Sequence, residues 1–334
     1  MNELQDYSKL YPNMPLEIGL FFSQTEMKDG RVIHKEVHSF CGYYQKKYET
    51  KEYPQPRVIS RMCDILCDNK QLSVIKRAGP DNLNSSYWCS LREEVRTDQI
   101  LQFYWNKKLS YIVYGFKFIY EDYKKYVLPV EFTNNTGDIS LGTCFLYSNG
   151  IATARHCIEG AKKIAIQGIP KEQLQLAKFE IHEHRLMDLL YIRFENPLND
   201  TIMFSQNAEV LDEVMTLGYP KIAGYHNFLT AENANVSARF TASIGQIASN
   251  AEDIWIREKL FLITAKIRGG NSGGPVVGNN GSVIGVAVNM SEGEGNYDEL
   301  GYGTVIPVKF IDEMINNQNK TYLDTSKIEF TDFV

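Results

Sequence analysis

Short apolar runs separated by turn residues fill the chain from Val127 onward. The first of them is VLPVEF, and similar runs follow at intervals. Regularly recurring short strands are typical of an all-β barrel or sandwich. We therefore predict further strands at 142–147, 163–169, 189–194, 214–219, 261–264 and 283–289.

The chain before Val127 has a mixed pattern. Two apolar runs within 16–44 flank Asp29-Gly30, a dipeptide that tolerates positive φ, and this arrangement predicts a β-hairpin. Segments 60–68 and 96–107 place apolar residues at helical spacing. Segment 111–120 is rich in β-branched and aromatic residues, which favour a strand. This part of the chain is predicted to be an α+β domain.

The change of pattern near residue 125 divides the chain, and 334 residues are enough for two domains. We predict a smaller α+β domain at 1–125, a mostly β domain at 126–320 and a C-terminal tail at 321–334. The run 306–316 has the apolar spacing of a short amphipathic helix at the end of the β domain.

Composition and charge exclude several classes of function. An apolar fraction of 43% and a charged fraction of 23% are ordinary for a folded chain. The formal charge of −6 gives no general attraction to nucleic acid or to anionic membranes, so neither is an expected partner. The N-terminus lacks a signal-peptide pattern, and no apolar run reaches membrane-spanning length. We therefore expect a cytoplasmic protein.

The cysteines and histidines do not indicate a metal site. Six cysteines are too few for a disulfide scaffold in a chain of this length. The candidate ligands in the first domain lack the spacing of a common zinc motif. They are His34, His38, Cys41, Cys63 and Cys67. We expect free thiols, no metal and no cofactor.

The strongest chemical signal is the segment GNSGGP at 270–275. Its glycines allow a tight turn that presents backbone N–H groups, and Ser272 at such a turn is a candidate nucleophile. A serine hydroxyl is a weak nucleophile by itself. It requires a base within hydrogen-bond reach and a third group that orients the base.

His156 and Asp188 are the candidates for these two roles. His156 lies in TARHC, after the apolar run GTCFLYSNGIA, and Asp188 opens the apolar run DLLYIRF. A buried carboxylate is costly unless it is hydrogen-bonded, and an imidazole N–H is a suitable partner. Each motif alone has a simple structural explanation: GNSGGP could be a turn, His156 a hydrogen-bonded polar residue, and Asp188 a cap before a strand. Together they follow the order His, Asp, Ser of one known type of catalytic triad.

These three segments resemble the trypsin-like peptidases, and most closely the HtrA-type branch. LDEVMTLGYP and GYGTVIPVKFIDEMI extend the resemblance, which covers residues 127–317. It implies the chymotrypsin fold, in which two β-barrels pack together with the triad in the cleft between them. His156 and Asp188 are then expected from the first barrel and Ser272 from the second.

The resemblance also implies a role for each residue. Ser272 would attack the scissile carbonyl, and His156 would take its proton and return it to the leaving amine. Asp188 would hold the imidazole in the required tautomer. The backbone N–H groups of Gly270 and Ser272 would form the oxyanion hole.

Three features depart from the relatives. Asn271 stands where digestive trypsins have an aspartate that pairs with a newly cut N-terminus, so activation by cleavage is not expected. Only a short segment follows the closing helix, so we expect no PDZ domain of the HtrA type. Cys144 is offset from the usual disulfide partner of the cysteine at position 157, so we expect Cys144 and Cys157 as thiols.

The specificity pocket is predicted from the same alignment. Lys266 stands where trypsins have the aspartate that binds basic side chains, so like charge disfavours a basic P1 residue. The other pocket positions are mostly apolar and favour a small or medium aliphatic P1 residue, with an acidic P1 residue as the alternative if Lys266 points inward. They are Ile267, Val288, Met290 and Thr304.

We therefore expect a serine endopeptidase that acts on protein or peptide substrates. The domain at 1–125 matches no family that we recognise, and we expect it to bind a protein partner or to restrain the active site. The alternative is a binding or scaffold protein that keeps the protease fold with little turnover. A third hypothesis, a chaperone-like holdase, rests only on analogy with HtrA-type proteins.

Overall fold

The computed structural model describes residues 3–24, 26–28, 31–220, 240–288 and 302–333. The chain forms two compact units, Met1–Ile119 and Tyr120–Val334. The division falls inside a long helix, a few residues before the change of sequence pattern. The predicted domain extents stay a prediction.

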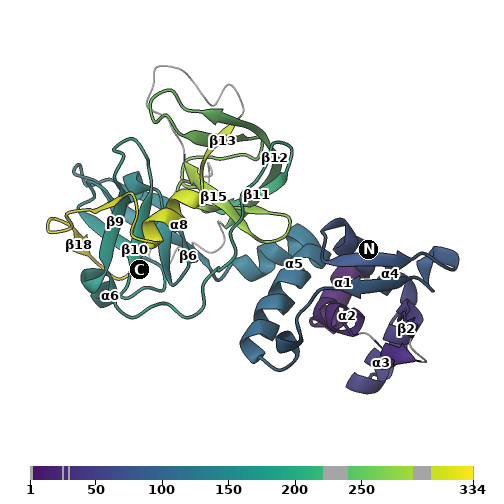
Figure 1. Cartoon of the computed structure of the whole chain (residues 1–334). Coiled ribbons are helices and arrows are strands. Elements are labelled where there is room, and N and C mark those ends of the chain that lie inside the picture. The colour runs from purple at the N-terminus through teal and green to yellow at the C-terminus, as the bar shows by residue number, and fades with distance from the viewer. Residues whose placement is uncertain (1–2, 25, 29–30, 221–239, 289–301, 334) are drawn as a thin grey trace. The chain divides into compact units, whose positions relative to one another are not determined.

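The first unit is mainly helical (Figure 1). Its helices are α1 (Glu3–Leu10), α2 (Met14–Phe22), α3 (Val37–Tyr48), α4 (Pro56–Asp68) and most of α5 (Gln99–Tyr123), with 3₁₀ turns at Pro80–Asn82 and Glu93–Arg96. Its strands are β1 (Glu26–Lys28), β2 (Arg31–Ile33), β3 (Leu72–Lys76) and β4 (Ser86–Cys89), which form two antiparallel pairs, β1–β2 and β3–β4. Buried apolar side chains of the helices, such as Ile18, Phe40 and Ile59, form a single core.

The predicted hairpin within 16–44 is mostly wrong. Its first run is the helix α2, in which all nine residues are buried and Pro15 lies in the first turn. A helix buried on every side has no polar face, so its sequence shows no helical period. The strands β1 and β2 do pair, over three residues each, and the predicted turn residues Asp29-Gly30 lie outside the described residues.

The predicted strand at 111–120 is also wrong, because this segment continues α5. Tyr111, Val113 and Ile119 are buried within the helix, and packing overrides the strand preference of β-branched and aromatic residues. Gly115, with φ of 68°, interrupts the helical backbone. The helical spacing of 60–68 and 96–107 did indicate α4 and the first part of α5.

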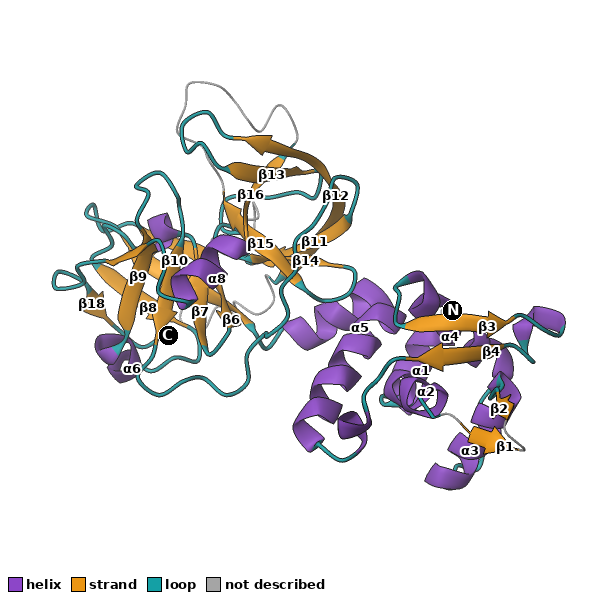
Figure 2. Ribbon diagram, viewed as in Figure 1, coloured by secondary structure: helices purple, strands orange, loops and turns teal. Residues whose placement is uncertain are grey.

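The second unit begins with an open, barrel-like sheet (Figure 2). Its strands are β5 (Val127–Thr133), β6 (Ile139–Tyr147), β7 (Gly150–Thr153), β8 (Lys163–Ile166), β9 (Lys178–His182), β10 (Leu190–Arg193), β17 (Lys320–Tyr322) and β18 (Glu329–Phe330). The strand order is β17-β9-β10-β7-β6-β5-β8-β18. The predicted tail therefore supplies the strand at each edge of this sheet.

The remaining strands of the second unit form a closed barrel. They are β11 (Glu213–Gly218), β12 (Thr241–Glu252), β13 (Lys259–Ile263), β14 (Pro275–Gly278), β15 (Val283–Val288) and β16 (Gly303–Pro307), in the order β11-β12-β13-β16-β15-β14. Side chains such as Val214, Ile263 and Val276 fill its core. Two further helices are α6 (Lys171–Leu176) and the predicted closing helix, α8 (Lys309–Ile315).

The predicted fold class is confirmed. Two barrel-like sheets follow an N-terminal α+β region, and every strand predicted after Val127 has a counterpart in them. These strands were predictable because turn residues separate them and because each carries its own apolar run.

Candidate active site

His156 lies in a short turn directly after β7. All four residues of β7 are buried, and the strand pairs with β6 and with β10. A 3₁₀ turn over Arg155–Cys157 follows. Ala154 and Cys157 are buried and anchor this turn, whereas His156 is exposed.

Asp188 reaches His156 because it lies just before β10, the neighbour of β7 in the sheet. Leu190 at the start of β10 is opposite Thr153 at the end of β7. Oδ2 of Asp188 lies 2.6 Å from Nδ1 of His156, and Oδ1 accepts a hydrogen bond of 2.9 Å from the His156 backbone N–H. These two contacts of Asp188 fix the orientation of the His156 ring, and they leave its Nε2 atom to act as a base.

Opposing effects act on the pKa of His156. The His156 side chain is 46% exposed, and desolvation of the covered part of the ring lowers its pKa, but the hydrogen bond to Asp188, with Cys157 beside it, outweighs this desolvation. The net result is a pKa of His156 above its usual value. The Asp188 carboxylate thus stabilises the imidazolium form that a general base passes through.

Ser272 lies in the loop between β13 and β14. The backbone N–H of Asn271 donates to the carbonyl of Arg268 at 2.8 Å, which closes a four-residue turn. Gly270, the third residue of this turn, has φ of 99°. That value matches a type II turn, in which the third position favours glycine. The glycine at 270 is therefore required by the backbone conformation.

Gly273, after the nucleophile candidate, is required for two reasons. Its φ of 85° is unfavourable for other residues. A Cβ at this position would also overlap the backbone carbonyl oxygen of Thr143 in β6. The loop can approach the first barrel closely only because residue 273 has no side chain.

The structure brings Ser272 next to the segment that carries His156. The carbonyl of Ser272 accepts hydrogen bonds from the backbone N–H of Thr143, at 2.9 Å, and from Sγ of Cys157, at 3.7 Å. Within the described part of the chain, no hydrogen bond joins the Ser272 hydroxyl to the imidazole. Catalytic hydrogen bonds are often long in a protein without substrate and tighten on binding.

Sequence reasoning missed Thr143, which holds the nucleophile loop. Its side chain is fully buried, and its hydroxyl donates to the carbonyl of Gly270 at 2.7 Å. The sequence did contain a signal for Thr143, because it is a polar residue inside the apolar run GTCFL. A hydroxyl buried in such a strand requires a hydrogen-bond partner elsewhere in the fold.

The structure describes four of the five predicted pocket residues. Val288 is buried and lies opposite Thr304 across β15 and β16, and Lys266 is exposed. Ile267 packs against β16, since a Cβ on Gly303 would lie 2.6 Å from its Cδ1. Met290 lies outside the described residues. The pocket stays a prediction.

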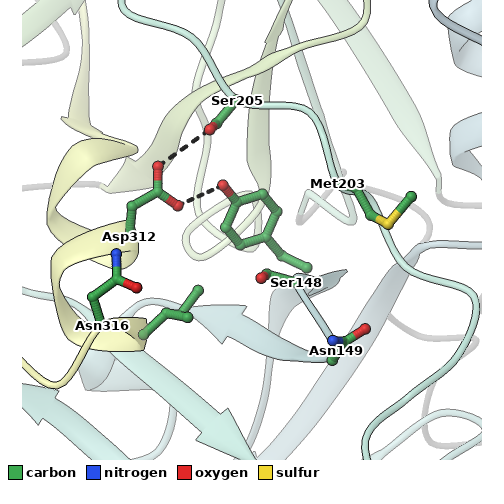
Figure 3. A pocket seen from close by; sticks show the side chains of 8 residues that line it. Ser148, Asn149, Met203, Ser205, Asp312 and Asn316 are labelled. Atoms are coloured by element: carbon green, nitrogen blue, oxygen red, sulfur yellow. Dashed lines mark hydrogen bonds between the residues drawn. The ribbon is translucent and has the colours of Figure 1, made fainter. Parts of the chain in front are cut away.

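A cavity of about 420 Å³ lies elsewhere on the second unit (Figure 3). It is lined by the turn after β6, by the segment after β10 and by α8, and by none of the predicted site residues. The carboxylate of Asp312 accepts hydrogen bonds there from Tyr147, at 2.7 Å, and from Ser205, at 3.2 Å. These bonds attach α8 to the first barrel.

The described residues contain no group of three His, Cys, Asp or Glu side chains suited to a metal ion. The six cysteines are free thiols. Among the described helices, none combines the length and apolar character needed to cross a membrane.

Residues 142–286 match the family model of the trypsin-like peptidase domain. This segment includes all three triad candidates. The chain therefore contains a trypsin-like peptidase domain. No curated protein matches the chain.

Solved structures that are similar to this chain include two kinds of protease. The active form of the Rv3671c protease from M. tuberculosis is 19% identical, with a TM-score of 0.47, over 63% of this chain and 88% of that one. A variant of the HtrA-type protease AlgW, solved with a tripeptide, is 19% identical, with a TM-score of 0.43, over 60% of this chain and 62% of that one.

Proposed function

We propose that the protein is a serine endopeptidase in which His156, Asp188 and Ser272 form the catalytic triad. A trypsin-like peptidase domain implies a peptide substrate. The observation that carries the proposal is the His156–Asp188 pair at 2.6 Å, beside a loop that presents Ser272.

The chemistry follows from this geometry. The Ser272 hydroxyl attacks the scissile carbonyl as Nε2 of His156 takes its proton, and the developing imidazolium is stabilised by Asp188. The N–H groups of Gly270 and Ser272 bind the oxyanion, which forms as the carbonyl carbon becomes tetrahedral. His156 then protonates the leaving amine as the C–N bond breaks. Water next attacks the acyl carbon while His156 takes its proton, and the bond to the Ser272 oxygen breaks as His156 returns the proton to it.

The test is labelling of the purified full-length protein with a fluorophosphonate probe, which reacts only with an activated serine. We expect the wild type to be labelled and Ser272→Ala to be unlabelled. Ser282→Ala is a matched control, because Ser282 is a buried serine of the same barrel with no part in the proposed triad. Absence of labelling in a folded wild type would contradict the proposal and favour a scaffold role for the fold.

We also propose that the helical unit at the N-terminus recognises a partner or restrains the peptidase. The support is its separate hydrophobic core, which makes it a compact unit of its own. The same probe tests restraint: a fragment from residue 120 onward should then be labelled faster than the full chain. Equal rates would leave partner recognition as the role.

A further inference from the structure

Thr143 contacts the nucleophile loop through both its side chain and its backbone. Its hydroxyl donates to the carbonyl of Gly270 at 2.7 Å, and its backbone N–H donates to the carbonyl of Ser272 at 2.9 Å. These two carbonyls flank Asn271. One residue of the first barrel thus holds the loop on either side of the residue that precedes the nucleophile.

The direction of the hydroxyl is fixed by a second neighbour. The backbone N–H of Tyr219 points at Oγ1 of Thr143, at 3.0 Å, and an amide N–H can only donate. The hydroxyl must therefore use its own proton for the carbonyl of Gly270. Thr143 is fully buried, so water does not compete for either bond.

The carbonyl of Thr143 connects the same residue to the base. It accepts a hydrogen bond of 2.8 Å from the hydroxyl of Thr153, which is also fully buried. Thr153 ends β7, three positions before His156. The segment that carries the base and the loop that carries the nucleophile therefore share Thr143 as a hydrogen-bond partner.

The loop needs this support because of its glycines. A Cβ at Gly269 would meet no atom within 4 Å, so side-chain packing does not restrain the turn there. Glycine is also free to take several backbone conformations. The peptide between Gly270 and Asn271 is instead held at both ends, by Thr143 at its carbonyl and by Arg268 at its N–H.

We propose that Thr143 is a positioning residue for the oxyanion hole, acting through its hydroxyl on the carbonyl of Gly270. The inference rests on the proposed serine peptidase function. Without this bond the peptide after Gly270 is held only by the hydrogen bond from Asn271 to Arg268, so rotation about the φ and ψ angles of Gly270 can turn its N–H away from the oxyanion. A hydrogen-bond donor that is held in place before the reaction stabilises the oxyanion more than a donor that can rotate away.

Two substitutions of Thr143 separate positioning from packing. Thr143→Val keeps the volume and removes the hydroxyl, whereas Thr143→Ser keeps the hydroxyl and removes a methyl group. We expect Thr143→Val to lower the second-order rate of fluorophosphonate labelling roughly 10- to 10²-fold, less than the 10²- to 10³-fold typical of a deleted donor. Thr143→Ser should label within about two-fold of the wild type. Thr201→Val, which alters a buried threonine that binds Asn149, should leave the rate unchanged.

The outcomes separate this inference from the proposed function. If the wild type is labelled and Thr143→Val is labelled equally fast, or if Thr143→Ser is as slow as Thr143→Val, the inference is wrong while the peptidase function stands. A folded wild type without labelling overturns both. If Thr143→Val does not fold, amide hydrogen exchange in the wild type decides: the N–H groups of Tyr219 and Asn271 should be strongly protected, and fast exchange at either one overturns the inference.

Discussion

The imidazole of His156 is held by a single carboxylate that makes two hydrogen bonds. One of them reaches the ring and the other reaches the backbone N–H of the same residue. Asp188 therefore fixes the position of the turn as well as the tautomer of the ring. It also raises the pKa of His156 against the opposing effect of burial.

The raised pKa of His156 predicts an alkaline shift of activity. A general base works only when it is unprotonated, so labelling should increase as pH rises through the pKa of His156 in the folded protein. Asp188→Asn removes the charge that raises this pKa, and the rising limb should move to lower pH. The maximal rate should fall by about 10⁴-fold, the loss typical of a triad aspartate.

The pH profile of fluorophosphonate labelling measures both effects. Asp312→Asn is the matched control, since Asp312 bonds Tyr147 and Ser205 away from the proposed triad. Its profile should coincide with that of the wild type. A rising limb that stays in place in Asp188→Asn would show that His156 is not the titrating base.

At the scale of elements, a buried charge cluster attaches the edge strand β17 to the first barrel. Glu180 of β9 is 1% exposed and binds Arg193 of β10 through both oxygens, at 2.9 and 3.1 Å. Nζ of Lys320 in β17 lies 2.6 Å from the same carboxylate, and that side chain is 9% exposed. The last segment of the chain is therefore part of the fold of the peptidase domain.

Removal of the Lys320 charge should weaken this attachment. Lys320→Met keeps the apolar stem but leaves Glu180 with one cation, and we expect a loss of roughly 1–3 kcal/mol in the free energy of unfolding. The other edge strand provides a control. Lys163 and Glu329 pair at 3.0 Å with exposed fractions of 52% and 60%, so Lys163→Met should cost less than about 1 kcal/mol. Urea denaturation measures both, and equal losses would refute the argument from burial.

At the scale of the whole molecule, the end of α5 belongs to the second unit. Tyr123 is fully buried there and its hydroxyl donates to the carbonyl of Gly281. The ring of Tyr120 stacks on Phe240 at 5.2 Å. A peptidase fragment should therefore include both tyrosines, although the sequence pattern changes only after them.

Two fragments test this placement. A fragment that begins at Tyr120 keeps the buried ring of Tyr123, whereas one that begins at Tyr126 loses it and leaves a cavity. We expect the shorter fragment to be less stable by roughly 3–5 kcal/mol, the range for deletion of a buried aromatic side chain. Urea midpoints of the two fragments provide the comparison. Coincident midpoints would mean that α5 contributes nothing to the peptidase domain.

Sequence alone was sufficient for the parts of the protein in which local signals are strong. The strands after Val127 carry their own apolar runs and turn residues, so the barrels were predictable. The motifs around His156, Asp188 and Ser272 could be recognised because tight turns and charged groups at strand ends require particular residues.

Tertiary structure decided what depends on burial and on distant partners. The helical state of α2 follows from packing on all sides, which removes the polar face that a sequence pattern requires. That of 111–120 follows from the burial of residues such as Tyr111 and Val113, which overrides their strand preference. The role of Thr143 depends on Gly270 and Tyr219, which are distant in sequence. The two strands of the last segment likewise form only because the first barrel offers each of them an edge, and β17 is also held by the opposite charge of Glu180. Hydrogen bonds across such distances leave no periodic trace in the chain.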